Sequence, residues 1–161
     1  MARHRFTNDR DGVVELPFKL IIAAVIVLIT VSVAYAGLES YSESSTQSGA
    51  ETAAKAVIAA AADVSSLGTN SSAKARLDIK GGIFHRVESF VVGCAPNETT
   101  YKCKGVEFKV SGSKAIWLVA KDQAGHDIVL KGKDRTVSLG EGSHELLLVK
   151  CLGYLEVREI S

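Results

Sequence analysis

The chain has 161 residues, 47% of them hydrophobic and 23% charged, a composition that excludes a disordered tail or a polar coil. Nineteen basic and 18 acidic residues leave a net charge of +1, without the basic excess of a dedicated nucleic-acid-binding protein. Three cysteines are too few for a disulfide-dense scaffold. The length suits one ordinary domain, or a small domain with an appendage.

The first predicted element is an apolar helix near the N-terminus. Residues 20–38 form a run of 19 residues without a charge. At 1.5 Å per residue a helix of this length spans about 28 Å, close to the thickness of the hydrocarbon core of a bilayer. Its polar members, Thr30, Ser32 and Tyr35, are tolerated in lipid because hydroxyl groups can bond back to the helix backbone. The run is therefore predicted to enter a membrane.

The charges on either side of this run predict its orientation. Basic residues precede it and acidic residues follow it, namely Arg3, Arg5, Arg10 and Lys19 before and Glu39, Glu43 and Glu51 after. The positive-inside rule then places the N-terminus in the cytoplasm and the C-terminal domain outside. Two sequons, beginning at Asn70 and Asn97, are useful only on an external surface and agree with this orientation.

Three interpretations of the N-terminus are open. The run could be an uncleaved signal anchor. It could belong to a secretory signal peptide cleaved after Ala36, because Ala34-Tyr35-Ala36 has the small-x-small form, although the apolar stretch is longer than usual. The third interpretation starts from residues 10–19, RDGVVELPFK, where a short basic leader ends in Gly12 and Glu15 follows at the start of the apolar helix.

This third pattern resembles the class III signal of type IV pilin-like proteins, especially archaeal pilins. The resemblance covers residues 10–41 and implies that a prepilin peptidase cleaves after Gly12, so that Val13 becomes the first mature residue. It further implies that the apolar helix is retained as the core of a filament built from copies of this chain. Glu15 would be the acidic residue near the new N-terminus.

Glu15 and Lys19 are the candidate assembly residues. They are spaced i,i+4 with the acid first, the favourable order for a helical ion pair, and the first turn of a helix stabilises a negative charge. After cleavage, the amino group of Val13 could pair with Glu15 of a neighbouring subunit and fix the axial register of a filament. The alternative, weighted equally, is that both charges simply lie at the edge of the membrane.

The next predicted element continues the helix beyond the apolar run. Residues 39–67 contain no proline and one glycine, and residues 50–62 are rich in alanine, the residue with the highest helix propensity. We favour one helix over residues 13–67, ending at Gly68 as a C′ cap. The alternative is a membrane anchor, a serine-rich linker and a separate short helix, because the serines and Gly49 in residues 42–49 could kink or fray the helix.

Strand patterns follow Gly68, separated by turn residues. The candidate strands are residues 75–79, 84–92, 105–110, 115–120, 127–130, 135–139, 144–150 and 154–160. Eight short runs at this spacing predict an antiparallel, sandwich-like head. The predicted fold class is therefore α+β, with a basic leader (1–12), a transmembrane or filament-core helix (13–38), a helical stalk and linker (39–72) and a β-rich extracellular head (73–161).

The three cysteines, Cys94, Cys103 and Cys151, allow one disulfide with one thiol left over. Cys94 and Cys103 bracket an eight-residue loop that contains the second sequon, and this pairing is slightly favoured. Pairing of either with Cys151, and a fully reduced state, remain open.

The sequence carries none of the common catalytic or cofactor motifs. It has no H-x-x-x-H or C-x-x-C spacing, no G-x-S-x-G elbow and no phosphate-binding glycine loop. We therefore expect no enzyme activity, no metal or cofactor, no small-molecule substrate and no nucleic-acid partner. A cluster of Lys131, Lys133 and Arg135 around a predicted turn is interpreted as solvated surface.

Together these patterns predict a structural subunit of a type IV pilus-like filament. It would be stored in the cell membrane, would polymerise through its N-terminal helix and would expose its head, glycosylated at Asn70 or Asn97, at the cell surface. The alternative is a single-pass membrane protein whose outer β domain binds an envelope layer or a secretion or motility machine. A secreted protein released after Ala36 is a third, less favoured hypothesis.

Overall fold

The computed structural model describes the backbone of residues 10–160 and the side chains of residues 17–160. Its first element, helix α1, spans Arg10–Ser66 without a break. The prediction of one continuous helix is confirmed, and the alternative with a serine-rich linker is wrong. Pro17 lies inside α1, where it lacks the N–H that would bond the carbonyl group one turn earlier.

The chain divides into two units, Met1–Ser40 and Tyr41–Ser161. The second unit takes in the last part of α1 together with all the strands. Residues 41–66, which make up most of the predicted helical stalk, belong to the same compact unit as the strands.

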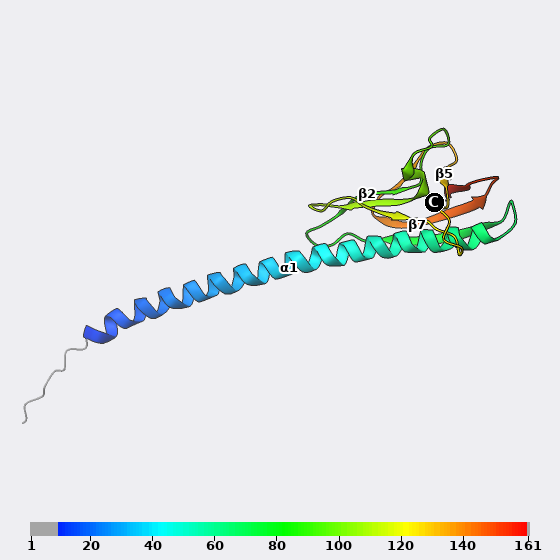
Figure 1. Ribbon diagram of the computed structural model, residues 1–161. Helices are drawn as coiled ribbons and strands as arrows, with labels where there is room; N and C mark the ends of the chain where they lie inside the picture. The colour runs from blue at the N-terminus through cyan, green and yellow to red at the C-terminus, as the bar shows by residue number, and fades with distance from the viewer. Residues whose placement is uncertain (1–9, 161) are drawn as a thin grey trace, which may run out of the picture. The chain divides into compact units, whose positions relative to one another are not determined.

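The part of α1 in this second unit buries one face made mostly of small residues. Its buried members follow helical spacing and are Ala50, Ala53, Ala54, Val57, Ala61 and Val64. Small side chains allow a helix to approach its neighbours closely. In Figure 1 the C-terminal half of α1 runs alongside β7, and a side chain from the end of β7 reaches the last turn of the helix.

The serine-rich patch within α1 is also used for packing. Ser42 and Thr46 are buried, and Thr46 Oγ1 donates a hydrogen bond to the Ser42 carbonyl oxygen at 2.8 Å. The Ser42 hydroxyl oxygen accepts a hydrogen bond from the Phe84 N–H at 3.2 Å. These residues do not interrupt the helix, because their hydroxyl groups are satisfied by α1 itself and by the loop around Phe84.

Eight strands lie within the part of the chain that the structure describes. They are β1 (Ser72–Ile79), β2 (Val87–Val92), β3 (Gly105–Val110), β4 (Ile116–Val119), β5 (Leu130–Gly132), β6 (Val137–Leu139), β7 (Gly142–Lys150) and β8 (Leu155–Glu159). Each predicted run overlaps one strand. The run at residues 127–130 is largely wrong, since β5 begins only at Leu130 and extends into the predicted turn.

The strands form two four-stranded sheets, in the orders β1-β7-β8-β5 and β4-β3-β2-β6. All neighbouring strands are antiparallel except β5 and β8, which run parallel with Leu130 opposite Leu155. The expectation of a purely antiparallel head is thus corrected. Between β5 and β8 the chain visits the other sheet as β6 and returns as β7, and such a long connection permits parallel pairing. The fold class is α+β.

One hydrophobic cluster joins α1 to strands of both sheets. At its centre the Phe90 and Phe108 rings stack with their centroids 6.3 Å apart. Outside α1, the residues that belong to this cluster or pack against it include Phe90, Val92, Phe108, Ile116, Leu118, Ile128, Leu130, Leu146, Leu148 and Leu155.

The C-terminus of α1 is capped by a residue far away in the sequence. The Lys150 ammonium group donates hydrogen bonds to the carbonyl oxygens of Ser65 and Leu67. The predicted cap at Gly68 is wrong, because Gly68 does not adopt the positive φ that such a cap needs. A cation at this position satisfies free carbonyl groups and interacts favourably with the negative end of the helix dipole.

We expect Lys150→Met to lower the free energy of unfolding by about 1–2 kcal/mol, because the methionine stem still packs but the two charge-assisted hydrogen bonds are lost. Chemical denaturation of the full chain in detergent, followed by circular dichroism, measures this loss. Lys74→Met is the control. Its ammonium group lies 3.6 Å from the Glu145 carboxylate in an exposed pair, and such pairs contribute under about 1 kcal/mol. Equal losses in the two variants would contradict the capping role.

Candidate functional site

The apolar segment of α1 exposes its whole surface in the isolated chain. Its large apolar side chains, from Phe18 to Leu38, are 44–68% exposed on every side of the helix. A monomeric soluble protein rarely exposes so large an apolar surface, so this segment requires lipid or another protein around it. By length and composition, α1 is the one helix among the described residues that could span a membrane.

Two hydroxyl groups in this segment bond to the backbone of the helix itself. Thr30 Oγ1 donates to the Ile26 carbonyl oxygen at 2.7 Å, and Ser32 Oγ donates to the Leu28 carbonyl oxygen at 2.8 Å. The prediction that the hydroxyl groups of this segment bond back to the helix is confirmed for Thr30 and Ser32. The segment can therefore enter an apolar medium without leaving either hydroxyl unpaired.

The predicted processing and assembly residues lie at the other end of this segment. Gly12, Val13 and Glu15 fall within the helical backbone of α1, but their side chains lie outside the described residues. The Lys19 side chain is described and exposed. The cleavage after Gly12 and the pairing of Glu15 stay predictions.

A disulfide bond joins Cys94 to Cys103, while Cys151 is a free, half-buried thiol. Both bonded cysteines are buried, and the loop between them carries the short 3-10 helix η1 (Tyr101–Lys104). Backbone hydrogen bonds link Cys94 to β5: the Cys94 N–H donates to the Leu130 carbonyl oxygen, and the Gly132 N–H donates to the Cys94 carbonyl oxygen. The disulfide therefore closes the loop between β2 and β3, two inner strands of one sheet, beside β5, an edge strand of the other sheet.

Replacing both Cys94 and Cys103 by serine should lower the free energy of unfolding by about 2–3 kcal/mol, as expected for a cross-link that closes a loop of this length. The measurement is denaturation under non-reducing conditions. Cys151→Ser is the matched control and should change stability by less than about 1 kcal/mol. A double variant as stable as the parent would show that the bond contributes nothing to the fold.

Both sequons present their asparagine at the surface, in different surroundings. Asn97 is exposed in the disulfide-closed loop, where the Glu98 N–H bonds the Ala95 carbonyl oxygen in a turn. Asn70 is exposed in the turn between α1 and β1, with φ of 69° and its N–H bonded to the Lys150 carbonyl oxygen. Positive φ is tolerated by asparagine, so Asn70 also has a purely structural role. Modification of either residue stays a prediction.

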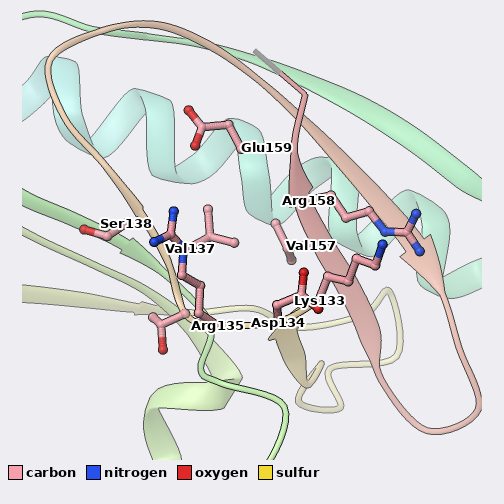
Figure 2. Close-up of a pocket in the computed structure, with 9 residues that line it drawn as sticks. Lys133, Asp134, Arg135, Val137, Ser138, Val157, Arg158 and Glu159 are labelled. Atoms are coloured by element: carbon pink, nitrogen blue, oxygen red, sulfur yellow. The ribbon is translucent and has the colours of Figure 1, made fainter.

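A groove of about 660 Å³ is lined by residues of β6, β8 and the loop that follows β5. Lys133, Arg135 and Arg158 line it together with Asp134 and Glu159. In Figure 2, Lys133 and Arg158 lie on one side of the groove and Arg135 on the other. Arg158 is bonded to the Glu156 carboxylate, and this hydrogen bond raises the pKa of its guanidinium group.

The sequence places Lys133 and Arg135 close together around a predicted turn, but it gives no indication that Arg158 lines the same groove. No sequence signal could have found it, because Arg158 reaches the groove only through the parallel pairing of β8 with β5. The groove offers the cations Lys133 and Arg135, while Arg158 is paired with Glu156, and this arrangement is suited to a weakly bound anionic or polar ligand.

His144 forms a structural contact in the head. His144 Nδ1 lies 2.8 Å from Glu159 Oε1, and His144 Nε2 lies 3.0 Å from the Gly140 carbonyl oxygen, so both ring nitrogens are engaged. This contact ties β7 to β8 and to the preceding turn. Among residues 17–160, no group of three or more histidine, cysteine or acidic side chains is arranged to hold a metal ion.

Two further groups have shifted pKa values with local causes. Hydrogen bonds from the backbone N–H groups of His126 and Ala124 lower the pKa of the Asp122 carboxyl in an exposed turn. A hydrogen bond with the Cys151 thiol raises the pKa of the Tyr154 phenol. Neither group lines the groove, and the first belongs to a turn whose geometry explains it.

Comparison with known proteins adds no identification: no family model, no curated protein and no solved structure matches this chain.

Proposed function

We propose that this chain is a structural subunit of a type IV pilus-like cell-surface filament. Its apolar helix is held in the cell membrane before assembly and then packs against copies of itself. Its β-rich head faces outward, with the two sheets stacked in a sandwich-like arrangement. The protein is a non-catalytic building block whose partners are the membrane, a prepilin peptidase and other copies of the chain.

The observation that carries this proposal is the continuity of α1. One helix holds a fully exposed apolar segment and, further along, a face buried in the head. A subunit that polymerises through its helix keeps the apolar segment uncovered until other copies pack against it, and in this chain the same helix continues into the head. The residues Gly12 and Glu15 just before the apolar segment support the same proposal.

A second candidate is a single-pass membrane protein whose outer domain binds a ligand. The cationic groove lined by residues of β6 and β8 favours it, because an open, polar cavity with Lys133 and Arg135 can serve as a binding site without any filament. The two candidates differ in their N-terminus and in their assembly.

The deciding experiment is mass spectrometry of the N-terminus of the protein recovered from cells. A mature chain that begins at Val13, with filaments visible by electron microscopy, supports the pilin-like subunit. An intact Met1 or Ala2 leaves the membrane-anchored binding protein. A start at Gly37 discards both in favour of a secreted domain.

The assembly role of Glu15 is tested by Glu15→Ala. We expect insertion into the membrane to be unchanged and filaments to be lost, because the subunits no longer share a fixed register. Glu51→Ala is the control, since it removes an exposed i,i+4 pair with Lys55 elsewhere in α1, where the two charges lie 2.7 Å apart. Filaments of Glu15→Ala as abundant as those of the control would overturn the register role.

A further inference from the structure

Strand β8 extends beyond its neighbour β5. The two strands pair from Leu130 opposite Leu155 to Gly132 opposite Val157, where β5 ends, whereas β8 continues to Glu159. On its other side β8 stays paired with β7 as far as Glu159. Within the part of the chain that the structure describes, the last part of β8 therefore has a neighbouring strand on one side only.

The backbone of Glu159 points to this open side. The Ile160 N–H donates to the Glu145 carbonyl oxygen at 2.8 Å, so the backbone groups of Ile160 point towards β7. Successive residues of a strand direct their N–H and C=O groups to opposite edges of that strand. The same alternation is seen earlier in β8, where the Leu155 N–H donates to the Val129 carbonyl oxygen on the β5 side. The N–H and C=O groups of Glu159 thus face the side where β5 has ended.

The groove described above lies along this open side. Val157, Arg158 and Glu159 of β8 line it together with Val137 and Ser138 of β6. β6 is the last strand of the other sheet, where it pairs with β2. In Figure 2, Ser138 and Arg158 lie on opposite sides of the groove. One strand edge from each sheet therefore borders the same groove.

The charges of the groove favour an acidic ligand. Its lining holds the exposed cations Lys133 and Arg135 and the exposed acid Asp134. Glu159, the other acid of the lining, already lies 2.8 Å from a histidine ring nitrogen of β7. Cations that line a binding groove attract ligands of opposite charge and discriminate against basic ones.

We propose that this groove is a strand-addition site for an extended acidic segment of a partner protein. The segment forms backbone hydrogen bonds with Glu159 on the open side of β8, and its acidic side chains contact Lys133 and Arg135. Val137 and Val157 supply the apolar part of the lining. In strand addition the backbone bonds provide affinity, and the side chains on alternate positions provide specificity. The site lies wholly within the head, so it goes beyond the proposed function and does not depend on filament assembly.

Fluorescence anisotropy with labelled peptides tests the proposal on the full chain in a neutral detergent. The probes are capped peptides of about eight residues, long enough for one strand, in which valine alternates with glutamate or with lysine. A third probe is the glutamate peptide with alternate backbone amides N-methylated, which keeps the charges but cannot pair as a strand. We expect the glutamate peptide to bind about tenfold or more tightly than either of the other two.

A charge reversal in the groove tests the contribution of its cations. The double variant Lys133→Glu with Arg135→Glu alters two exposed side chains and should weaken binding of the glutamate peptide by about tenfold or more. The double variant Lys114→Glu with Lys121→Glu is the matched control. It makes the same change of net charge on exposed residues that do not line the groove, and it should weaken binding by less than about threefold.

A proline substitution tests the open side of β8. Glu159→Pro removes the N–H that faces the groove and leaves the bonds of Ile160 to β7 in place. Glu159→Ala is the reference, because both variants lose the carboxylate and only the proline variant loses the N–H. We expect the proline variant to bind the glutamate peptide about tenfold more weakly than the alanine variant.

Four results would overturn the proposal. Equal affinity for the acidic and basic peptides refutes the role of the cations. An N-methylated peptide that binds as tightly as the unmodified one assigns the groove to anions that do not pair as strands. Loss of peptide binding as the protein concentration rises assigns the groove to a second copy of this chain. Failure of every peptide to bind means that the charges only protect the strand edges from pairing.

Discussion

Replacing Ala54 by aspartate should unfold the head while leaving the apolar segment helical. Ala54 is fully buried on the small-residue face of α1, so aspartate there adds volume and an unpaired charge to the core. We expect the free energy of unfolding to fall by about 4 kcal/mol or more, the range of substitutions that bury an unpaired charge. Urea denaturation of the full chain in detergent, followed by Trp117 fluorescence, measures the change.

Ala59→Asp provides the matched control, since the same substitution is made five residues later, at an exposed position of the same helix. Only the difference in helix propensity between alanine and aspartate applies there, about 0.7 kcal/mol. If the two variants unfolded at the same urea concentration, residues 41–66 would be a stalk beside the head and not part of its core.

A second large effect is expected in the strand next to α1. Leu148 of β7 is fully buried and belongs to the cluster that joins the helix to the two sheets. Leu148→Ala should lower the free energy of unfolding by about 2–5 kcal/mol, because it removes buried methyl groups and leaves a cavity. Thermal unfolding followed by near-ultraviolet circular dichroism is a suitable measurement.

Leu152→Ala is the control for this prediction, because Leu152 lies in the turn that follows β7 and is largely exposed. The same chemical change there should cost less than about 0.5 kcal/mol. A Leu148→Ala protein as stable as Leu152→Ala would mean that β7 does not face the core in the way described.

The helix and most strands could be predicted because their signals are local. The alanine-rich stretch of residues 50–62 has both high helix propensity and the spacing of a buried face, and residues 105–110 alternate as a half-buried strand does. The position of β5 could not be predicted, because a strand of three residues is too short to show a regular alternation of buried and exposed side chains. Its position depends on β8, which follows it by more than 20 residues.

The contacts at the surface of α1 show a different limit of prediction. The serines and Gly49 of residues 42–49 indicate a weak point in the helix, yet Ser42 and Thr46 are buried, and the Ser42 hydroxyl bonds the loop around Phe84. Likewise Gly68 was the obvious local cap, whereas the actual cap is Lys150, over 80 residues away. Local propensity cannot reveal that a distant segment will satisfy a polar group.

The cysteine loop shows what spacing alone can indicate. The short interval between Cys94 and Cys103 favoured their pairing, and the structure contains this bond. Spacing gave no indication that the Cys94 backbone would also join β5, because that link depends on how the two sheets come together.

The position of β7 along α1 has a mechanical consequence. Tension that reaches residues 41–66 is carried along the axis of one helix into its buried face. Because the helix and β7 run alongside each other, that pull acts as shear and strains every contact from Ala50 to Val64 at once. Contacts that are strained at the same time require a higher force to break than contacts that are broken one after another. We therefore expect a higher unfolding force when the head is pulled through α1 than when it is pulled through its C-terminus at β8.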